Sequence, residues 1–73
     1  MVKNYIFRST CYDRELFRRL AIALKENSVD FKVITKSKDV QSRAPLSQYF
    51  EVEIHINEPD YEKGDRIMRE LED

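Results

Sequence analysis

Cys11 is the only cysteine of this chain and the first residue whose type and position could do chemistry. It follows a run of strand-forming residues and precedes a helical pattern, where the positive end of a helix could lower the pKa of a thiol and make it a nucleophile or redox sensor. Such a nucleophile also needs a base, and no histidine or second cysteine stands near it in the sequence. We therefore predict that Cys11 packs as a small apolar side chain.

His55 is the only histidine. It alternates with Glu51 and Glu53 in a run that we expect to be a strand, so the three side chains should share one polar face. A histidine flanked by carboxylates could bind a metal between two subunits, titrate near neutrality, or simply occupy a solvated surface position. A zinc cage built by one chain is excluded, because the chain has no second histidine or cysteine.

The remaining chemistry-bearing patterns are also sparse. With one glycine, the chain cannot form a glycine-rich loop that cradles phosphate. We therefore predict no catalytic residues, no metal site and no cofactor, and we expect that the protein is not an enzyme.

The basic residues suggest nucleic-acid binding, but their distribution has a simpler explanation. Residues 1–47 contain ten basic and five acidic residues, whereas residues 48–73 contain three basic and nine acidic ones. The two parts are opposite in sign and the whole chain has a net charge of −1. We expect the two predicted helices to lie side by side and pair these charges, which leaves nucleic-acid binding as a weaker alternative.

One small domain has to position all of these residues. The chain has 73 residues, of which 41% are hydrophobic and 37% charged, and we expect a single domain over residues 1–73. A chain this short hides only about 60% of its unfolded surface, so its stability should be marginal or shared with a partner. No apolar run approaches the roughly 18 residues of a membrane span, and no secretory signal is recognisable, so we expect a cytoplasmic protein.

Hydrophobic periodicity predicts three strands and two helices. The expected strands are Val2–Arg8, Val29–Lys36 and Gln48–Asn57. Both faces of the first could be covered, because Tyr5 and Phe7 point to one side of it and Ile6 to the other.

The first helix should begin at one of three capping residues, Ser9, Thr10 or Asp13, and end at Asn27, which could adopt the left-handed conformation. The second should be capped by Asn57 or Glu58 with Pro59 in its first turn. Gly64 lies in its apolar stripe, which indicates that this helix approaches the sheet closely.

The segment Ser37–Ser47 is polar and basic, contains Pro45, and is the one long loop that we expect. It holds too few apolar residues to order itself, so we predict that it is mobile in the free protein. Ile22 is an isolated aliphatic residue on the charged face of the first helix. The candidate partner-binding residues are Lys38, Arg43, Leu46, Tyr49 and Ile22.

The element order is therefore β-α-β-β-α. A right-handed crossover followed by an antiparallel third strand predicts an α+β fold with a three-stranded sheet in the order 1-3-2 and both helices on one face. This is a ferredoxin-like arrangement lacking its fourth strand, and it leaves the first strand as an open edge. A weak homodimer through that edge and a monomer whose edge is protected by Lys3 and Arg8 are nearly equal alternatives.

In its pattern the chain resembles a family of short bacterial proteins described as prokaryotic signal-transducing proteins. The resemblance rests on three segments, NYIFRST, DRELFRRLAIALKENSVDFKV and VEIHINEPDYEKGDRIMREL. The chain departs from the family at Asn27-Ser28, where glycine is frequent, and at Gly64, where a small alanine-like residue is frequent. The resemblance implies no catalytic residues; it implies a likeness to PII-type regulators, whose loop between the second and third strands docks onto targets.

These observations favour a non-enzymatic regulatory or protein-interaction module whose partner contacts the loop and the free sheet face or edge. A small-molecule-sensing regulatory domain, with its ligand at a dimer interface, is the alternative from a different class.

Overall fold

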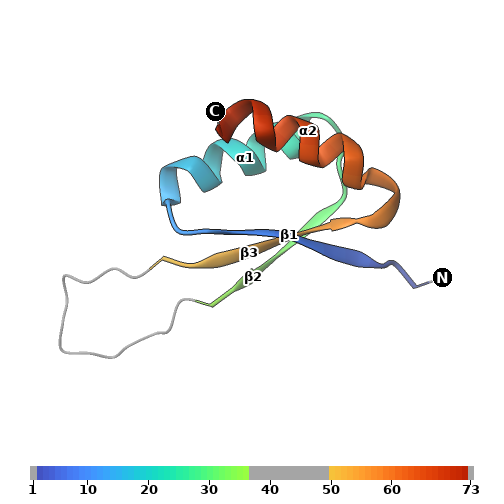
Figure 1. Ribbon diagram of the computed structural model, residues 1–73, viewed down its shortest axis with the longest axis horizontal. Helices are drawn as coiled ribbons and strands as arrows, with labels where there is room; N and C mark the ends of the chain where they lie inside the picture. The colour runs from blue at the N-terminus through green and yellow to red at the C-terminus, as the bar shows by residue number, and fades with distance from the viewer. Residues whose placement is uncertain (1, 37–49, 73) are drawn as a thin grey trace.

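The computed structural model describes residues 2–36 and 50–72, which form an α+β fold. The elements are β1 (Tyr5–Cys11), α1 (Arg14–Glu26), β2 (Phe31–Thr35), β3 (Val52–Asn57), a short 3-10 helix η1 (Glu58–Asp60) and α2 (Tyr61–Glu72). The strands form one antiparallel sheet in the order β1-β3-β2, and both helices cover the same face of it (Figure 1). The predicted element order, strand order and helix placement are confirmed.

The core lies between the central strand and the two helices. Alternate residues of β3, namely Val52, Ile54 and Ile56, are buried on the helix side. They pack with Leu20 and Leu24 of α1 and with other apolar residues of the core, among them Met68 of α2. The period of two in the strand and the period near 3.6 in the helices bring these side chains into one layer.

Local capping determines where α1 begins and ends. The Asp13 carboxylate accepts hydrogen bonds from the backbone N–H groups of Glu15 and Leu16, so Asp13 is the cap among the three candidates. At the other end the left-handed residue is Ser28, with φ of 59°, and not Asn27 as predicted. Asn27 instead donates from its side chain to the carbonyl of Ala23 at 2.8 Å.

The strand boundaries differ from the prediction because strand length depends on the pairing partner. β1 begins three residues later than expected and continues to Cys11, since Thr10 and Cys11 pair with Glu53 and Val52. β2 is confined to Phe31–Thr35 and β3 begins at Val52. Residues 48 and 49, where β3 was expected to begin, lie outside the described residues.

The segment before α2 is more irregular than predicted. Asn57 precedes η1 but makes no side-chain cap to it, and Pro59 lies in this short helix and not in α2 itself. The close approach at Gly64 is confirmed, because a Cβ atom added there would lie 2.8 Å from Cδ1 of Ile56 and 3.2 Å from Cγ1 of Val29.

β1 carries a bulge at Arg8. Phe7 pairs with His55 and Ser9 pairs with Ile54, which are consecutive in β3. Arg8 is therefore an extra residue of β1 that has no pairing partner in β3. Arg8 follows Ile6 by two residues and therefore projects on the helix side of the sheet, where its Nε atom lies 2.9 Å from Oδ1 of Asp65 in α2. The bulge places Ser9 on this side as well and directs Cys11 into the core. Arg8 is therefore not a surface charge on the edge of the sheet.

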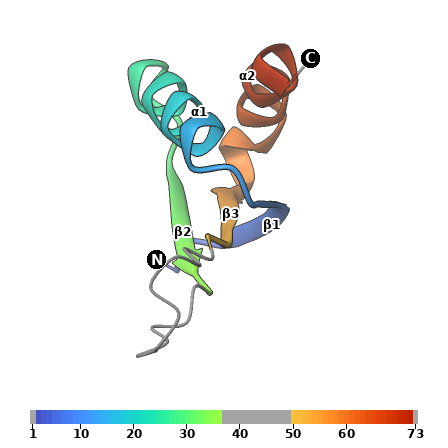
Figure 2. The ribbon, with the colours of Figure 1, turned by 90° about the vertical axis from the view of Figure 1, so that its left-hand side faces the viewer.

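The opposite face of the sheet has neither α1 nor α2 on it. In Figure 2 both helices lie on one side of the three strands, with α1 on the β2 side and α2 on the β1 side. The expectation that both faces of β1 could be covered is therefore wrong for the described elements. Neither described helix has the length and apolar character that a membrane crossing requires.

Candidate functional site

The candidate site is the face of the sheet opposite the helices, which we call the outer face. The strand register assigns alternate residues of each strand to this face. Its members are Tyr5, Phe7 and Thr10 of β1, Lys32 and Ile34 of β2, and Glu53, His55 and Asn57 of β3.

A polar cluster occupies the middle of the outer face. Nε2 of His55 lies 3.0 Å from Oε1 of Glu53, and Nζ of Lys36 lies 3.2 Å from the second oxygen of that carboxylate. The hydrogen bond from His55, followed by that from Lys36, holds the pKa of Glu53 below its usual value. The Phe7 and His55 rings make a T-shaped contact, with 5.5 Å between their centroids.

Apolar side chains flank this cluster on both sides. Phe7 of β1 is 50% exposed and Ile34 of β2 is 37% exposed. Because β1 and β2 are the two edge strands, these side chains lie on opposite sides of the polar cluster. The outer face thus offers two apolar contacts separated by a hydrogen-bonded centre.

Asp30 collects three hydrogen bonds at one end of the outer face. Tyr5 donates its hydroxyl to Oδ1 at 2.9 Å, and Lys3 and the Asn57 amide donate to Oδ2 at 2.9 and 3.1 Å. The bonds from Lys3 and then Tyr5 lower the pKa of Asp30, and the bonds to Asp30 raise the pKa values of Lys3 and Tyr5. Nζ of Lys32 lies 5.4 Å from the centroid of the Tyr5 ring.

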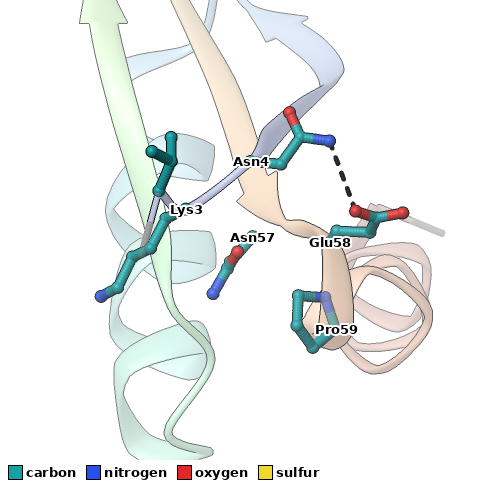
Figure 3. A pocket seen from close by; sticks show the side chains of 6 residues that line it. Lys3, Asn4, Asn57, Glu58 and Pro59 are labelled. Carbon is teal, nitrogen blue, oxygen red and sulfur yellow. Dashed lines mark hydrogen bonds between the residues drawn. The ribbon is translucent and has the colours of Figure 1, made fainter.

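An open pocket of about 360 Å³ lies beside this cluster, where β1 begins and β3 ends (Figure 3). Asn4 donates from its side chain to Oε1 of Glu58 at 3.3 Å across one side of the pocket. Its polar side chains are bonded to other residues of the chain. The lining residues are Val2, Lys3, Asn4, Asn57, Glu58 and Pro59.

Cys11 and His55, the two residues whose types could do chemistry, lie in different environments. Cys11 is 6% exposed, belongs to the core as predicted, and donates from its thiol to the carbonyl of Asp13 at 3.3 Å. His55 lies on the outer face beside Glu53, as its alternation predicted. Within residues 2–36 and 50–72, no three His, Cys, Asp or Glu side chains come together as a group that could hold a metal.

The candidate partner-binding residues are not brought together. Ile22 is 54% exposed on α1, which lies in the helix layer and not on the outer face. The other candidates, Lys38, Arg43, Leu46 and Tyr49, lie outside the described residues, as does the segment 37–47 that we expect to be mobile.

The opposite charges of the two parts of the chain do meet, but not where we expected. The bridges between the parts join Arg8 of β1 to Asp65 and Glu72, and Lys36 to Glu53. In the part of the chain that the structure describes, no ion pair joins α1 to α2. The expected charge pairing between the two helices is therefore wrong, because the cation that reaches Asp65 and Glu72 of α2 comes from the helix side of β1.

Sequence reasoning missed the roles of Arg8 and Asp30. Arg8 looked like an edge charge, although its spacing of two from Ile6 indicates the helix side of the strand. Asp30 looked like one more polar residue of an alternating strand. The only sequence signal for Asp30 is its position two residues after Ser28, where the chain turns from α1 into β2. The contacts with Lys3 and Tyr5 depend on strand order, which a local pattern does not contain.

No family model, curated protein or solved structure matches this chain at a significant level. The fold and the chemistry of the outer face are therefore the basis for a functional proposal.

Proposed function

We propose that this chain is a non-enzymatic regulatory module that binds a protein partner through the outer face of its sheet. The observation that supports this most directly is the combination of a half-exposed Phe7 and an exposed Ile34 on a sheet face that neither helix covers. Single exposed apolar residues are ordinary, but two on one uncovered face provide an area that a partner can desolvate.

The charges of the outer face indicate which partner would fit. Glu53 is already neutralised by His55 and Lys36, whereas Lys32 makes no ion pair with any described residue and only approaches the Tyr5 ring. A complementary surface would place apolar side chains over Phe7 and Ile34 and a carboxylate near Lys32. Such complementarity contributes more to specificity and association rate than to affinity.

The resemblance to prokaryotic signal-transducing proteins is the support for a regulatory role. By analogy with PII-type regulators, Lys38, Arg43, Leu46 and Tyr49 would add contacts to the same partner. Ile22 would require a second, separate contact, because α1 lies on the other side of the sheet. Nucleic-acid binding remains the weaker alternative, since the net charge is −1 and the sheet face carries carboxylates.

One observation favours the second candidate function, a small-molecule sensor. The pocket of Figure 3 has the Lys3 ammonium and the Glu58 carboxylate in its wall, together with the Asn4 and Asn57 amides. Lys3 is paired with Asp30 and Glu58 with Asn4, so a ligand with both a carboxylate and an ammonium group, such as a free amino acid, would replace these contacts. At 100 times its dissociation constant such a ligand would stabilise the protein by about 2.7 kcal/mol, which a thermal-shift panel of amino acids would detect.

Site-directed photocrosslinking tests the proposed outer face. A photoreactive phenylalanine analogue at position 7 should capture one partner in cells, and the same analogue at position 22 serves as the matched control on α1. The captured protein is then purified, and its affinity is measured for the wild type and for the variants Phe7→Ser, Ile34→Ser and Ile22→Ser.

We expect Phe7→Ser and Ile34→Ser to weaken binding at least tenfold, because each removes an apolar contact worth about 1.5 kcal/mol or more. Ile22→Ser should leave the affinity within about twofold. Unchanged binding by both outer-face variants, or a loss confined to Ile22→Ser, would move the interface away from the outer face.

A further inference from the structure

The edge formed by β1 has main-chain groups that point out of the sheet. The backbone N–H of Glu58 donates to the carbonyl of Asn4 at 2.9 Å, so Asn4 directs its main-chain groups toward β3. Bonded and non-bonded pairs alternate in an antiparallel ladder. Ile6 therefore also faces β3, and the N–H and C=O groups of Tyr5 and Phe7 face away from the sheet.

The two charges that should guard this edge are both engaged within the subunit. Nζ of Lys3 lies 2.9 Å from Asp30. Arg8 projects to the helix layer, is only 10% exposed, and bonds both Asp65 and Glu72. Charged residues on an edge strand normally prevent pairing with another chain. Here Arg8 is withdrawn to the helix layer, and Lys3 precedes β1 and is paired with Asp30.

The other edge of the sheet keeps its protection. Lys32 lies within β2 between Phe31 and Val33, whose main-chain groups face out of the sheet. The segment Tyr5–Phe7 of β1 contains no charged residue. The comparison singles out β1 as the edge that can accept another strand.

We propose that β1 pairs antiparallel with β1 of a second copy of this chain, about a twofold axis at Ile6, to form a continuous six-stranded sheet. Tyr5 of each copy then lies opposite Phe7 of the other, and each such pair exchanges two main-chain hydrogen bonds. On the outer face these positions form two aromatic cross-strand pairs, which stabilise antiparallel contacts. On the helix face the two Ile6 side chains cover one another.

The bulge limits how far this contact extends. Regular pairing ends at Arg8, so the shared ladder is short and the interface belongs to the transient class. This contact is made by the main chain of β1, whereas the partner proposed above contacts side chains of the outer face. Phe7 takes part in both, so the test of the dimer leaves its side chain unchanged.

Backbone methylation gives the sharpest test, because it removes a hydrogen-bond donor without changing a side chain. A chain of 73 residues can be assembled by chemical ligation with an N-methyl group at Phe7, whose N–H faces out of the β1 edge. The matched control carries the N-methyl group at Val33, which the same alternation places on the outward side of β2. Sedimentation equilibrium from about 10 µM to about 1 mM then measures association of each protein.

We expect the wild type and the Val33-methylated protein to show the same concentration-dependent increase in mass, and the Phe7-methylated protein to associate at least tenfold more weakly. A constant monomer mass for the wild type, or equal association of the Phe7-methylated protein, would overturn the proposal. Circular dichroism shows that each variant has folded.

Disulfide crosslinking tests the register. In a Cys11→Ala background, Ile6→Cys places two thiols at a non-hydrogen-bonded antiparallel pair with Cα atoms about 4.5 Å apart, a spacing that a disulfide can bridge. We expect Ile6→Cys to form a covalent dimer readily on mild oxidation, and the control Ile34→Cys on β2 not to. Equal crosslinking of both variants would show that the contact does not run through β1.

Discussion

Arg8 of β1, together with Lys36, joins the two oppositely charged parts of the chain. Its guanidinium lies 2.9 Å from both Asp65 and Glu72 and also donates to the Ser9 hydroxyl at 3.1 Å. Arg69 contacts the same Asp65 carboxylate, but from an exposed position on α2. The two arginines therefore offer a direct comparison between a shielded and a solvated ion pair.

Replacing Arg8 by methionine should lower the free energy of unfolding by about 1.5–3 kcal/mol, because it removes charged hydrogen bonds from a largely shielded guanidinium while keeping an apolar stem. Arg69→Met should cost less than about 1 kcal/mol, since its pair is exposed to solvent. Urea denaturation of both variants measures the difference. Equal losses of unfolding free energy would mean that shielding from solvent does not strengthen the Arg8 contacts.

The hydrogen bonds to Asp30 should make stability depend on acid pH. Its pKa is lowered in the folded protein, so the stabilisation is complete above the ordinary value of 3.8 and is lost as pH falls through the lower folded value. We expect Asp30→Asn to flatten the decline of the thermal midpoint below about pH 4. Glu70→Gln, at an exposed position on α2, is the control, and identical acid profiles for Asp30→Asn and the wild type would contradict the prediction.

At the scale of elements, the missing side chain of Gly64 allows α2 to approach the sheet closely. Any Cβ atom there would press on Ile56, whose side chain is buried, and on Val29. A glycine inside a helix costs about 1 kcal/mol relative to alanine, so this close packing has to offset that cost. A glycine is needed here because α2 lies close to Ile56 and Val29, and not because of its backbone conformation, since its φ is not positive.

Gly64→Ala should therefore destabilise the protein by about 1 kcal/mol, although helix propensity alone predicts a gain of similar size. Adding Ile56→Val removes the Cδ1 atom that a new Cβ would meet, so the two substitutions together should cost less than the sum of their separate effects. A double-mutant cycle by chemical denaturation measures this coupling. Strict additivity would show that α2 shifts to accommodate the methyl group.

The elements also show which boundaries a sequence can indicate. Asp13 begins α1 and the chain turns within one residue of the predicted end, because helix caps are local hydrogen bonds. The limits of β1 were wrong at both ends, because Cys11 belongs to the strand only through its pairing with Val52. The bulge at Arg8 likewise depends on the pairing of β1 with β3 and cannot be recognised from the sequence of either strand alone.

At the scale of the whole molecule, the architecture was more predictable than the candidate site. Binary patterning and the handedness of the crossover were enough for the element order and the strand order 1-3-2. Alternation in β3 also placed His55 and Glu53 on one face. The contacts of Asp30 with Lys3 and Tyr5, and of Arg8 with α2, join residues 25 or more positions apart and follow only from the assembled sheet.

The strand order also has a consequence for how the protein is made. Among the described strands, β1 and β2 both pair with β3, which follows them in the chain, and not with each other. During synthesis neither has its partner strand until residues 52–57 have left the ribosome, so apolar residues of β1 and β2 remain unpaired in the nascent chain. The sheet therefore forms only after β3 has been translated, and a product terminated before Val52 would present two unpaired strands to chaperones and proteases.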